Sequence, residues 1–149
     1  MKNLILTGLA SFILASCSGS GLKTYGEYLS ASKNSENSNV VIYRPSAFVG
    51  GGTFITVTLN GSELGRLGNN EFVIGEMQDG RNYLNLKVGG IQGLGINQTT
   101  EIFEKKTKSN TYFYVNFTYD SMNTFGPVNL KIAINEISLY QFRAAVAQK

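Results

Sequence analysis

The sequence predicts a mostly β protein: an antiparallel β-sandwich of about seven to eight short strands with a short C-terminal helix. Eight tyrosines and nine phenylalanines favour strands, because aromatic side chains fit a pleated surface. Seventeen glycines against two prolines indicate many turns, and turn residues recur about every ten positions, as in sandwiches. No sustained alternation of strands and helices is visible, which argues against a parallel sheet.

The strands are expected after residue 38, separated by turn residues. The stretch Thr53–Leu59 alternates, with Ile55, Val57 and Leu59 on one face. Asn60-Gly61 follows it and is the strongest short hairpin pattern. The expected strands are 39–44, 53–59, 63–67, 71–75, 82–88, 99–105, 110–119 and 128–134.

A short helix is expected after the last strand. Ser138 would cap it, with Leu139, Phe142, Ala145 and Val146 facing inward. The chain of 149 residues has the length of one domain, and 42% hydrophobic against 15% charged residues is enough for a core. We therefore expect one β-sandwich domain over 39–149.

Residues 1–16 have the pattern of a lipoprotein signal peptide. An apolar run at 4–14 follows Lys2 and is too short for a membrane span, which needs roughly 20 residues. Leu14-Ala15-Ser16-Cys17 resembles the bacterial lipobox, a signal in which the cysteine thiol receives lipid and the chain is cut just before it. Cys17, the only cysteine, is thus the predicted lipidation site, with membrane lipid as its partner.

The alternative is an ordinary signal peptide with an incidental cysteine. An unpaired, exposed thiol in an oxidising compartment would be a liability, which favours lipidation. The neutral Ser18 resembles the residue at this position in lipoproteins sent to the outer membrane. We expect a lipid-anchored protein of the bacterial cell envelope, at the outer membrane.

Residues 17–38 are rich in Ser, Gly and Asn and are expected to form a flexible linker. A flexible chain of this length would reach roughly 25 Å. The alternative is a helical turn packed on the domain, because Leu22, Tyr25, Tyr28 and Leu29 have near-helical spacing.

Composition excludes several kinds of chemistry. The chain has no histidine, which removes imidazole catalysis and most metal sites, and the +3 charge is too small and scattered for nucleic-acid binding. The glycine clusters at 50–52 and 89–95 lie between expected strands and are read as hairpin loops rather than phosphate cradles. Glu101 and Glu104, beside Lys105, are read as a solvated strand edge. No catalytic residue, metal or cofactor is expected.

Three residues are candidates for binding. Arg44, at the end of the first strand, could bind an anion or a peptide carboxylate, although such an arginine more often pairs with a carboxylate or stacks on a ring. Tyr112 and Tyr114 share one face of a strand and could stack on a sugar or peptide, although a tyrosine row is also typical of a second sheet face.

Several short motifs resemble a family of small bacterial lipoproteins that carry a domain of unknown function. The similarity covers roughly 39–142, and this part of the chain also resembles PEGA-type β-sandwiches. The family has a proline-glycine turn where this chain has Asp79-Gly80. It implies an exported β-sandwich lipoprotein and no activity. The motifs are Val41-Ile42-Tyr43-Arg44-Pro45-Ser46, Val57-Thr58-Leu59-Asn60-Gly61-Ser62-Glu63-Leu64-Gly65-Arg66-Leu67, Gly80 before a Leu-x-Leu strand, and Thr111-Tyr112-Phe113.

We expect a lipid-anchored envelope protein that carries a non-catalytic binding or structural module. The expected partner of this module is an envelope protein or a glycan. The alternative is a periplasmic inhibitor or immunity lipoprotein that captures a wall-attacking enzyme with the loops at 49–52 and 89–96. A glycan hydrolase is the third hypothesis, and it lacks an evident pair of carboxylates across a cleft.

Overall fold

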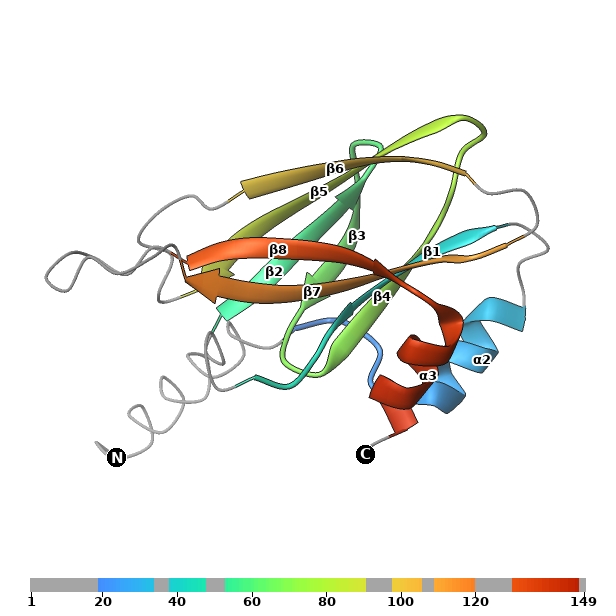
Figure 1. Cartoon of the computed structure of the whole chain (residues 1–149), viewed down its shortest axis with the longest axis horizontal. Coiled ribbons are helices and arrows are strands. Elements are labelled where there is room, and N and C mark those ends of the chain that lie inside the picture. Colours follow the sequence, from blue (N-terminus) through green and yellow to red (C-terminus); the bar gives the residue numbers. More distant parts are fainter. Residues whose placement is uncertain are drawn as a thin grey trace, which may run out of the picture.

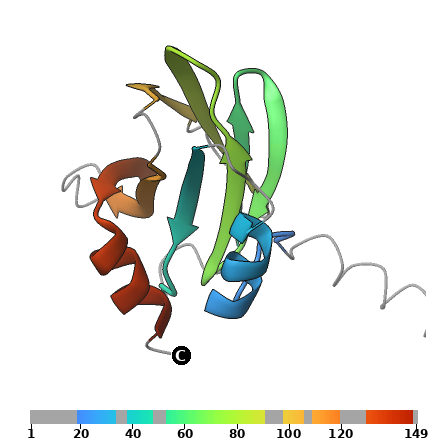
Figure 2. The same cartoon turned by 90° about the vertical axis from the view of Figure 1, so that its right-hand side faces the viewer.

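The computed structural model describes residues 19–33, 38–47, 53–90, 98–105, 109–119 and 130–147. Two four-stranded sheets pack face to face in a sandwich, with two helices at one end (Figures 1 and 2). The prediction of a mostly β sandwich with a C-terminal helix is confirmed. The elements are α2 (Tyr25–Lys33), β1 (Asn39–Arg44), β2 (Thr53–Leu59), β3 (Ser62–Leu67), β4 (Glu71–Glu76), β5 (Arg81–Gly90), β6 (Gln98–Glu104), β7 (Thr111–Tyr119), β8 (Leu130–Ile137) and α3 (Leu139–Ala147).

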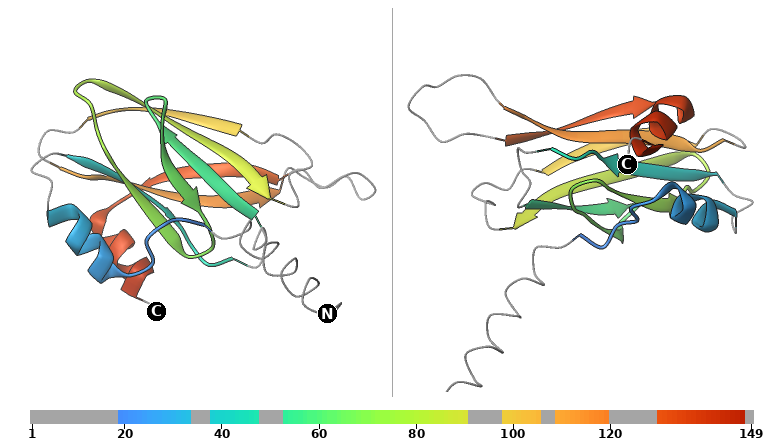
Figure 3. Two further views of the ribbon diagram at one scale, coloured as in Figure 1. Left: turned by 180° about the vertical axis from the view of Figure 1, so that it is seen from behind. Right: turned by 90° about the horizontal axis from the view of Figure 1, so that it is seen from below.

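One sheet has the strand order β4-β1-β7-β8 and the other has the order β3-β2-β5-β6. Figure 3 shows the two layers from below. All neighbouring strands are antiparallel except β1 and β7, which pair in parallel with Val41 opposite Tyr112. The expectation of an antiparallel sandwich therefore needs one correction. A parallel pair joins strands that are far apart in the chain, and no local turn residue announces it.

The core between the sheets is formed by the alternating inner positions of the strands. Ile55, Val57 and Leu59 of β2 are buried on the face that the sequence pattern predicts. The turn after them is the predicted hairpin, with φ of 50° at Asn60 and 86° at Gly61.

A second apolar cluster covers the opposite face of the β4-β1-β7-β8 sheet, where the helices pack. Strand β1 is buried on both faces, which explains why its sequence is a continuous rather than an alternating apolar run. Ser138 caps α3 as predicted: its hydroxyl accepts the Gln141 N–H at 3.2 Å, and its own N–H donates to the Gln141 side-chain oxygen at 2.8 Å. The buried members of the cluster are Tyr28, Val41, Tyr43, Phe72, Tyr112, Phe142 and Val146.

Two details of the helices differ from the sequence predictions. Leu139 was expected to face inward but is 37% exposed. Helix α2 occupies part of the predicted linker, because Thr24 and Glu27 form a capping box at its start. The Thr24 hydroxyl accepts the Glu27 N–H at 3.2 Å, and the Glu27 carboxylate accepts the Thr24 N–H at 2.7 Å. Tyr28 then inserts into the second cluster at 5% exposure. The flexible-linker interpretation is therefore wrong for this part of the chain.

Candidate functional site

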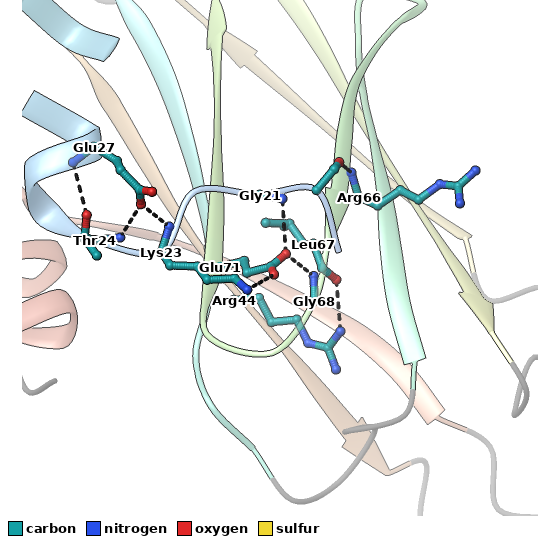
Figure 4. Close-up of polar contacts among 10 residues, drawn as sticks. Gly21, Lys23, Thr24, Glu27, Arg44, Arg66, Leu67, Gly68 and Glu71 are labelled. Atoms are coloured by element: carbon teal, nitrogen blue, oxygen red, sulfur yellow. Dashed lines mark hydrogen bonds and ion pairs between the residues drawn. The ribbon is translucent and has the colours of Figure 1, made fainter. Parts of the chain in front are cut away.

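The predicted lipidation site, Cys17, lies outside the described residues, as do the signal peptide at 1–16 and most of the loops at 49–52 and 89–96. The described chain starts at Gly19, and residues 19–22, the N-terminal strap, run along the β3–β4 edge of the sandwich (Figures 1 and 4). The strap is thus the described segment nearest to the predicted anchor.

Hydrogen bonds from its backbone and from the Ser20 hydroxyl fix the strap to the domain. The Ser20 N–H donates to the Arg66 carbonyl at 2.7 Å, and the Ser20 hydroxyl accepts the Arg66 N–H at 2.9 Å. Leu22 and Phe72 exchange two N–H···O bonds of 2.8 and 2.9 Å, as neighbouring antiparallel residues do. The chain is therefore held from Ser20 onward.

The glycines of the strap are required by close contact rather than by flexibility. A Cβ atom added at Gly19 would overlap the Gly68 backbone nitrogen and the Glu71 carboxylate. A Cβ atom at Gly21 would lie 2.9 Å from the Glu71 Cβ, and the Gly21 N–H donates to the Glu71 carboxylate at 3.2 Å. The Ser-Gly composition that suggests a linker is here a fitted contact.

Gly19→Ala is expected to destabilise the domain by about 1–3 kcal/mol, because the added methyl group forces the strap away from Glu71 and Gly68. Urea denaturation monitored by circular dichroism measures the change. Gly26→Ala, in α2, is the matched control: its Cβ would meet only the Thr24 hydroxyl at 3.9 Å, so a small gain in stability of roughly 0.5–1 kcal/mol is expected. Equal effects of the two substitutions would contradict the fitted strap.

Glu71 is a buried carboxylate that organises the strap and the start of β4. It is 4% exposed and accepts the Gly68 N–H at 2.8 Å, in addition to the Gly21 N–H (Figure 4). Lys23 lies 3.6 Å from it on the solvent side. A buried carboxylate is stable when hydrogen bonds and positive charge compensate for lost hydration, and here both are present.

Arg44, a predicted binding residue, lies inside the domain at 1% exposure. Its guanidinium donates to the Thr53 carbonyl at 2.8 Å and to the Leu67 carbonyl at 3.1 Å, and it stacks over Phe117 with 4.9 Å from Cζ to the ring centroid. Burial lowers the pKa of Arg44, and the negative charge of Glu71 opposes that shift. The residue is therefore a structural bridge between the two sheets and is not available to an external ligand.

Tyr112, the second predicted binding residue, is covered by the helices. It is 7% exposed, its hydroxyl shares a 2.8 Å hydrogen bond with that of Tyr28, and its ring stacks on Phe142 at 5.1 Å. Tyr114, the third, is half-buried and packs edge-on against Tyr43 at 6.2 Å. The tyrosine row is thus the second sheet face, packed under α2 and α3, rather than an open binding surface.

The burial of Tyr112 predicts a loss of stability at high pH. Burial, with the hydrogen bond to Tyr28, raises the pKa of Tyr112 to about 12, whereas an unfolded tyrosine titrates near 10. Above pH 10 the unfolded chain loses this proton and the folded chain keeps it, so stability falls between about pH 10 and 12. The fall in melting temperature is expected to be smaller in Tyr112→Phe than in the control Tyr140→Phe, whose side chain is 80% exposed. Identical pH profiles would contradict the burial of this hydroxyl.

A cleft of about 480 Å³ opens on the side of the sandwich where the edge strands β6 and β8 face each other. On the opposite side, the short turn at 68–70 joins β3 to β4 and links the two sheets. Figure 1 shows β6 and β8 diverging from each other along this side. Sequence analysis did not predict this cleft, because its walls come from segments more than 25 residues apart. Its lining residues are Glu101, Ile102, Phe103, Glu104, Lys105, Thr111, Phe113, Ile134 and Glu136.

The floor of the cleft is aromatic. Phe103 of β6 and Phe113 of β7 pack edge-on at 5.1 Å between ring centroids, bridging the two sheets, and Ile134 of β8 packs beside them. Phe113 is almost fully buried, whereas Phe103 and Ile134 are half-buried and line the opening. A ligand entering here would meet apolar surface.

The walls of the cleft carry opposed carboxylates. Glu101 alternates with Phe103 on the inner side of β6, and Glu136 lies opposite Phe113 in the β7–β8 register, which places it on the inner side of β8. Lys105 also lines the cleft, and its ammonium pairs with Asp79 at 2.9 Å; that hydrogen bond and the lysine charge lower the pKa of Asp79. One carboxylate from each sheet and a paired lysine therefore line the cleft, whereas the sequence had suggested only a solvated edge for Glu101.

One buried polar atom beside the cleft has no hydrogen-bond partner among the residues that the structure describes. Thr111, the first residue of β7, is 2% exposed and lines the cleft two residues before Phe113. Its hydroxyl oxygen is buried and makes no hydrogen bond with the described residues. A buried hydroxyl without a partner costs about 1–3 kcal/mol. This oxygen is thus a buried polar atom beside the cleft that the described residues leave unpaired.

Within the described ranges, no three acidic, histidine or cysteine side chains lie close enough together to hold a metal ion. None of the described helices is long and apolar enough to cross a membrane. No family model matches the chain, and comparisons with curated proteins and with solved structures return no match.

Proposed function

We propose that the protein is a lipid-anchored component of the bacterial cell envelope, with its β-sandwich as a non-catalytic binding module. The observation that carries this proposal is the Leu14-Ala15-Ser16-Cys17 pattern directly after an apolar run. A thiol at this position suits a thioether link to lipid, and the chain has no other cysteine. The proposed location is the outer membrane.

The strap supports a close attachment to the membrane. One residue separates Cys17 from Gly19, so two extended residue steps span at most about 7 Å before the chain meets the domain. This is much shorter than the flexible tether that the Ser-Gly composition suggests. In the proposed arrangement, lipid on Cys17 holds the β3–β4 edge near the bilayer.

Binding is assigned to the cleft between β6 and β8. This cleft combines an apolar floor with polar and charged side chains from both sheets, which is the combination of groups expected in a ligand pocket. It lies on the side of the sandwich away from the strap, because β6 and β8 are the edges opposite β3 and β4. A domain anchored through its strap would thus present the cleft to the compartment in front of the membrane, where an envelope protein or glycan partner could reach it.

Partition between aqueous and detergent phases tests the anchor. The full chain, made in a bacterial host, is expected in the detergent phase, and Cys17→Ala is expected in the aqueous phase or retained as uncut precursor. Ser16→Ala is the control, since a small residue before the cysteine is kept. An aqueous wild-type protein that is cut at another position would overturn the proposal.

A further inference from the structure

The outer face of the β3-β2-β5-β6 sheet carries two neighbouring cations at one end. The helices pack on the outer face of the other sheet, and neither described helix covers this one (Figure 2). In the strand register, Arg66 of β3 and Lys87 of β5 both lie opposite Thr56 of β2, and both cations are exposed. Because neighbouring strands are about 4.8 Å apart, the two residues lie about 10 Å from each other.

The exposed acidic residues of this face lie at its other end. Glu63 adjoins the turn between β2 and β3, and Glu104 lies opposite Arg81 in the β5–β6 register. Among the described residues, neither Arg66 nor Lys87 forms an ion pair with a carboxylate. The face is therefore positively charged at one end and carries its acidic groups at the other.

The cationic end adjoins the strap. The Ser20 backbone and hydroxyl are hydrogen-bonded to the backbone of Arg66. Three residue steps lead from Cys17 to Ser20, and they span at most about 11 Å. Lys23 and Glu71, which also lie beside the strap, pair at 3.6 Å and offset each other. Lipid on Cys17 would therefore bring the charges of a bilayer surface close to Arg66, at a distance comparable with the Debye length of about 8 Å.

An aromatic side chain accompanies the two cations. Phe54 lies two residues before Thr56, on the outer side of β2, and is half-buried. The Arg66 guanidinium lies 5.0 Å from its ring centroid, and a Cβ atom added at Gly89 would lie 2.5 Å from the ring. Protection of a sheet edge explains an exposed cation on β3, but it explains neither Lys87 on the interior strand β5 nor an outward-facing phenylalanine.

We infer that this end of the sheet docks on a bilayer surface that carries anionic phospholipid headgroups. The inference rests on the proposed function, in which lipid on Cys17 brings the domain to the bilayer. Arg66 and Lys87 attract the headgroup phosphates, and the Phe54 ring supplies apolar contact beside them. Basic residues next to an aromatic ring are typical of surfaces that lie in the headgroup region.

Docking would give the anchored domain one preferred orientation. Each lysine or arginine near an anionic surface is expected to favour the docked over the free state about fivefold, and added salt weakens the attraction. The contact involves β3, β2 and β5, so it leaves the side of the sandwich between β6 and β8 open. A soluble acidic polymer would meet the same cations, but the position of the strap beside Arg66 favours the bilayer.

Paramagnetic relaxation in lipid nanodiscs tests the inference. The full, ¹⁵N-labelled protein, isolated from a bacterial envelope, is added to discs of phosphatidylcholine and to discs with a two-to-one mixture of phosphatidylcholine and phosphatidylglycerol. Each disc contains a gadolinium-chelating lipid. The amide signals of Phe54, Arg66 and Lys87, relative to that of Arg81, are expected to broaden at least about twofold more in the anionic discs, and high salt is expected to remove the difference.

Two substitutions of equal charge give a matched comparison. Lys87→Gln is expected to lower the ratio of docked to free protein about fivefold. Arg81→Gln, on the same face but at the far end, is expected to leave this ratio unchanged. Equal effects of the two substitutions would show that only the total charge matters, and would overturn the docked orientation.

The same experiment separates this inference from the proposed anchor, because incorporation into the neutral discs reports the lipid on Cys17. Incorporation without any difference between neutral and anionic discs retains the anchor and overturns the docking surface. Binding to anionic discs alone, with the expected broadening, supports the surface and removes the anchor. Failure to bind either disc overturns both.

Dextran sulfate, added to the protein in neutral discs, is the probe for a soluble partner. Shifts of the amides of Arg66 and Lys87 with this polymer, without extra broadening in the anionic discs, would assign the face to a soluble polyanion and overturn the bilayer assignment. Extra broadening in the anionic discs supports the bilayer assignment whether or not the polymer binds.

Discussion

Arg44→Met is expected to lower the free energy of unfolding by about 3–5 kcal/mol. The guanidinium is buried and donates to two carbonyls, those of Thr53 and Leu67, while it stacks on Phe117. Methionine keeps most of the volume but supplies no donor and no charge. Glu71, itself buried, also loses the positive charge that acts on it from Arg44. Chemical denaturation measures the loss.

Two further variants sharpen this test. Arg44→Lys retains the charge but lacks the planar fork that reaches both carbonyls, so an intermediate loss of about 1–3 kcal/mol is expected. Arg81→Met, at an exposed position at the start of β5, is the matched control and is expected to change stability by no more than about 0.5 kcal/mol. If Arg44→Met were as mild as Arg81→Met, the structural role assigned to Arg44 would be wrong.

Phe142→Ala is expected to cost about 3–5 kcal/mol. This side chain is fully buried at the centre of the second cluster, with ring centroids 5.1–6.1 Å from those of Tyr28, Tyr43, Phe72 and Tyr112. Removing it leaves a cavity beneath both helices and unseats α2 as well as α3.

Tyr140→Ala is the control for this experiment, because Tyr140 lies on the same helix but is 80% exposed. Its expected effect is within about 0.5 kcal/mol. Thermal unfolding followed at a helix-sensitive wavelength separates the two variants. A cost for Phe142→Ala close to that of Tyr140→Ala would show that α3 contributes little to the packing of the domain.

The local features of the fold were predictable because their causes are local. Asn60-Gly61 determines a hairpin through the backbone angles that these two residues adopt readily. Ser138 and Gln141 define the start of α3 through hydrogen bonds three residues apart. The alternation of Ile55, Val57 and Leu59 identifies the inner face of β2 without knowledge of its partners.

Helix α2 was missed although its sequence carries a pattern that indicates it. Thr24 and Glu27 have the spacing of a capping box, and Tyr28 follows as the buried residue of the first turn. The surrounding Ser, Gly and Asn residues favour a linker when composition is considered alone. Tertiary contacts with Phe142 and Tyr112 stabilise a helix that is too short to persist by itself.

The candidate site depended on long-range geometry. The parallel pairing of β1 with β7 places the chain so that β6 and β8 become facing edges of different sheets. Glu101 and Glu136 are 35 residues apart in the sequence and line the same cleft only for this reason. Arg44 and Tyr112 were predicted as binding residues from their residue types alone. In the structure both side chains are buried and belong to the interior of the domain.

Mass analysis of the N-terminal peptide, from protein extracted from the envelope of a bacterial host, tests the central claim most directly. The account predicts a mature chain that begins at Cys17, with a mass increased by thioether-linked lipid, and loss of this species in Cys17→Ala. An N-terminus at another residue, with an unmodified Cys17 or without it, would contradict the lipid-anchored function.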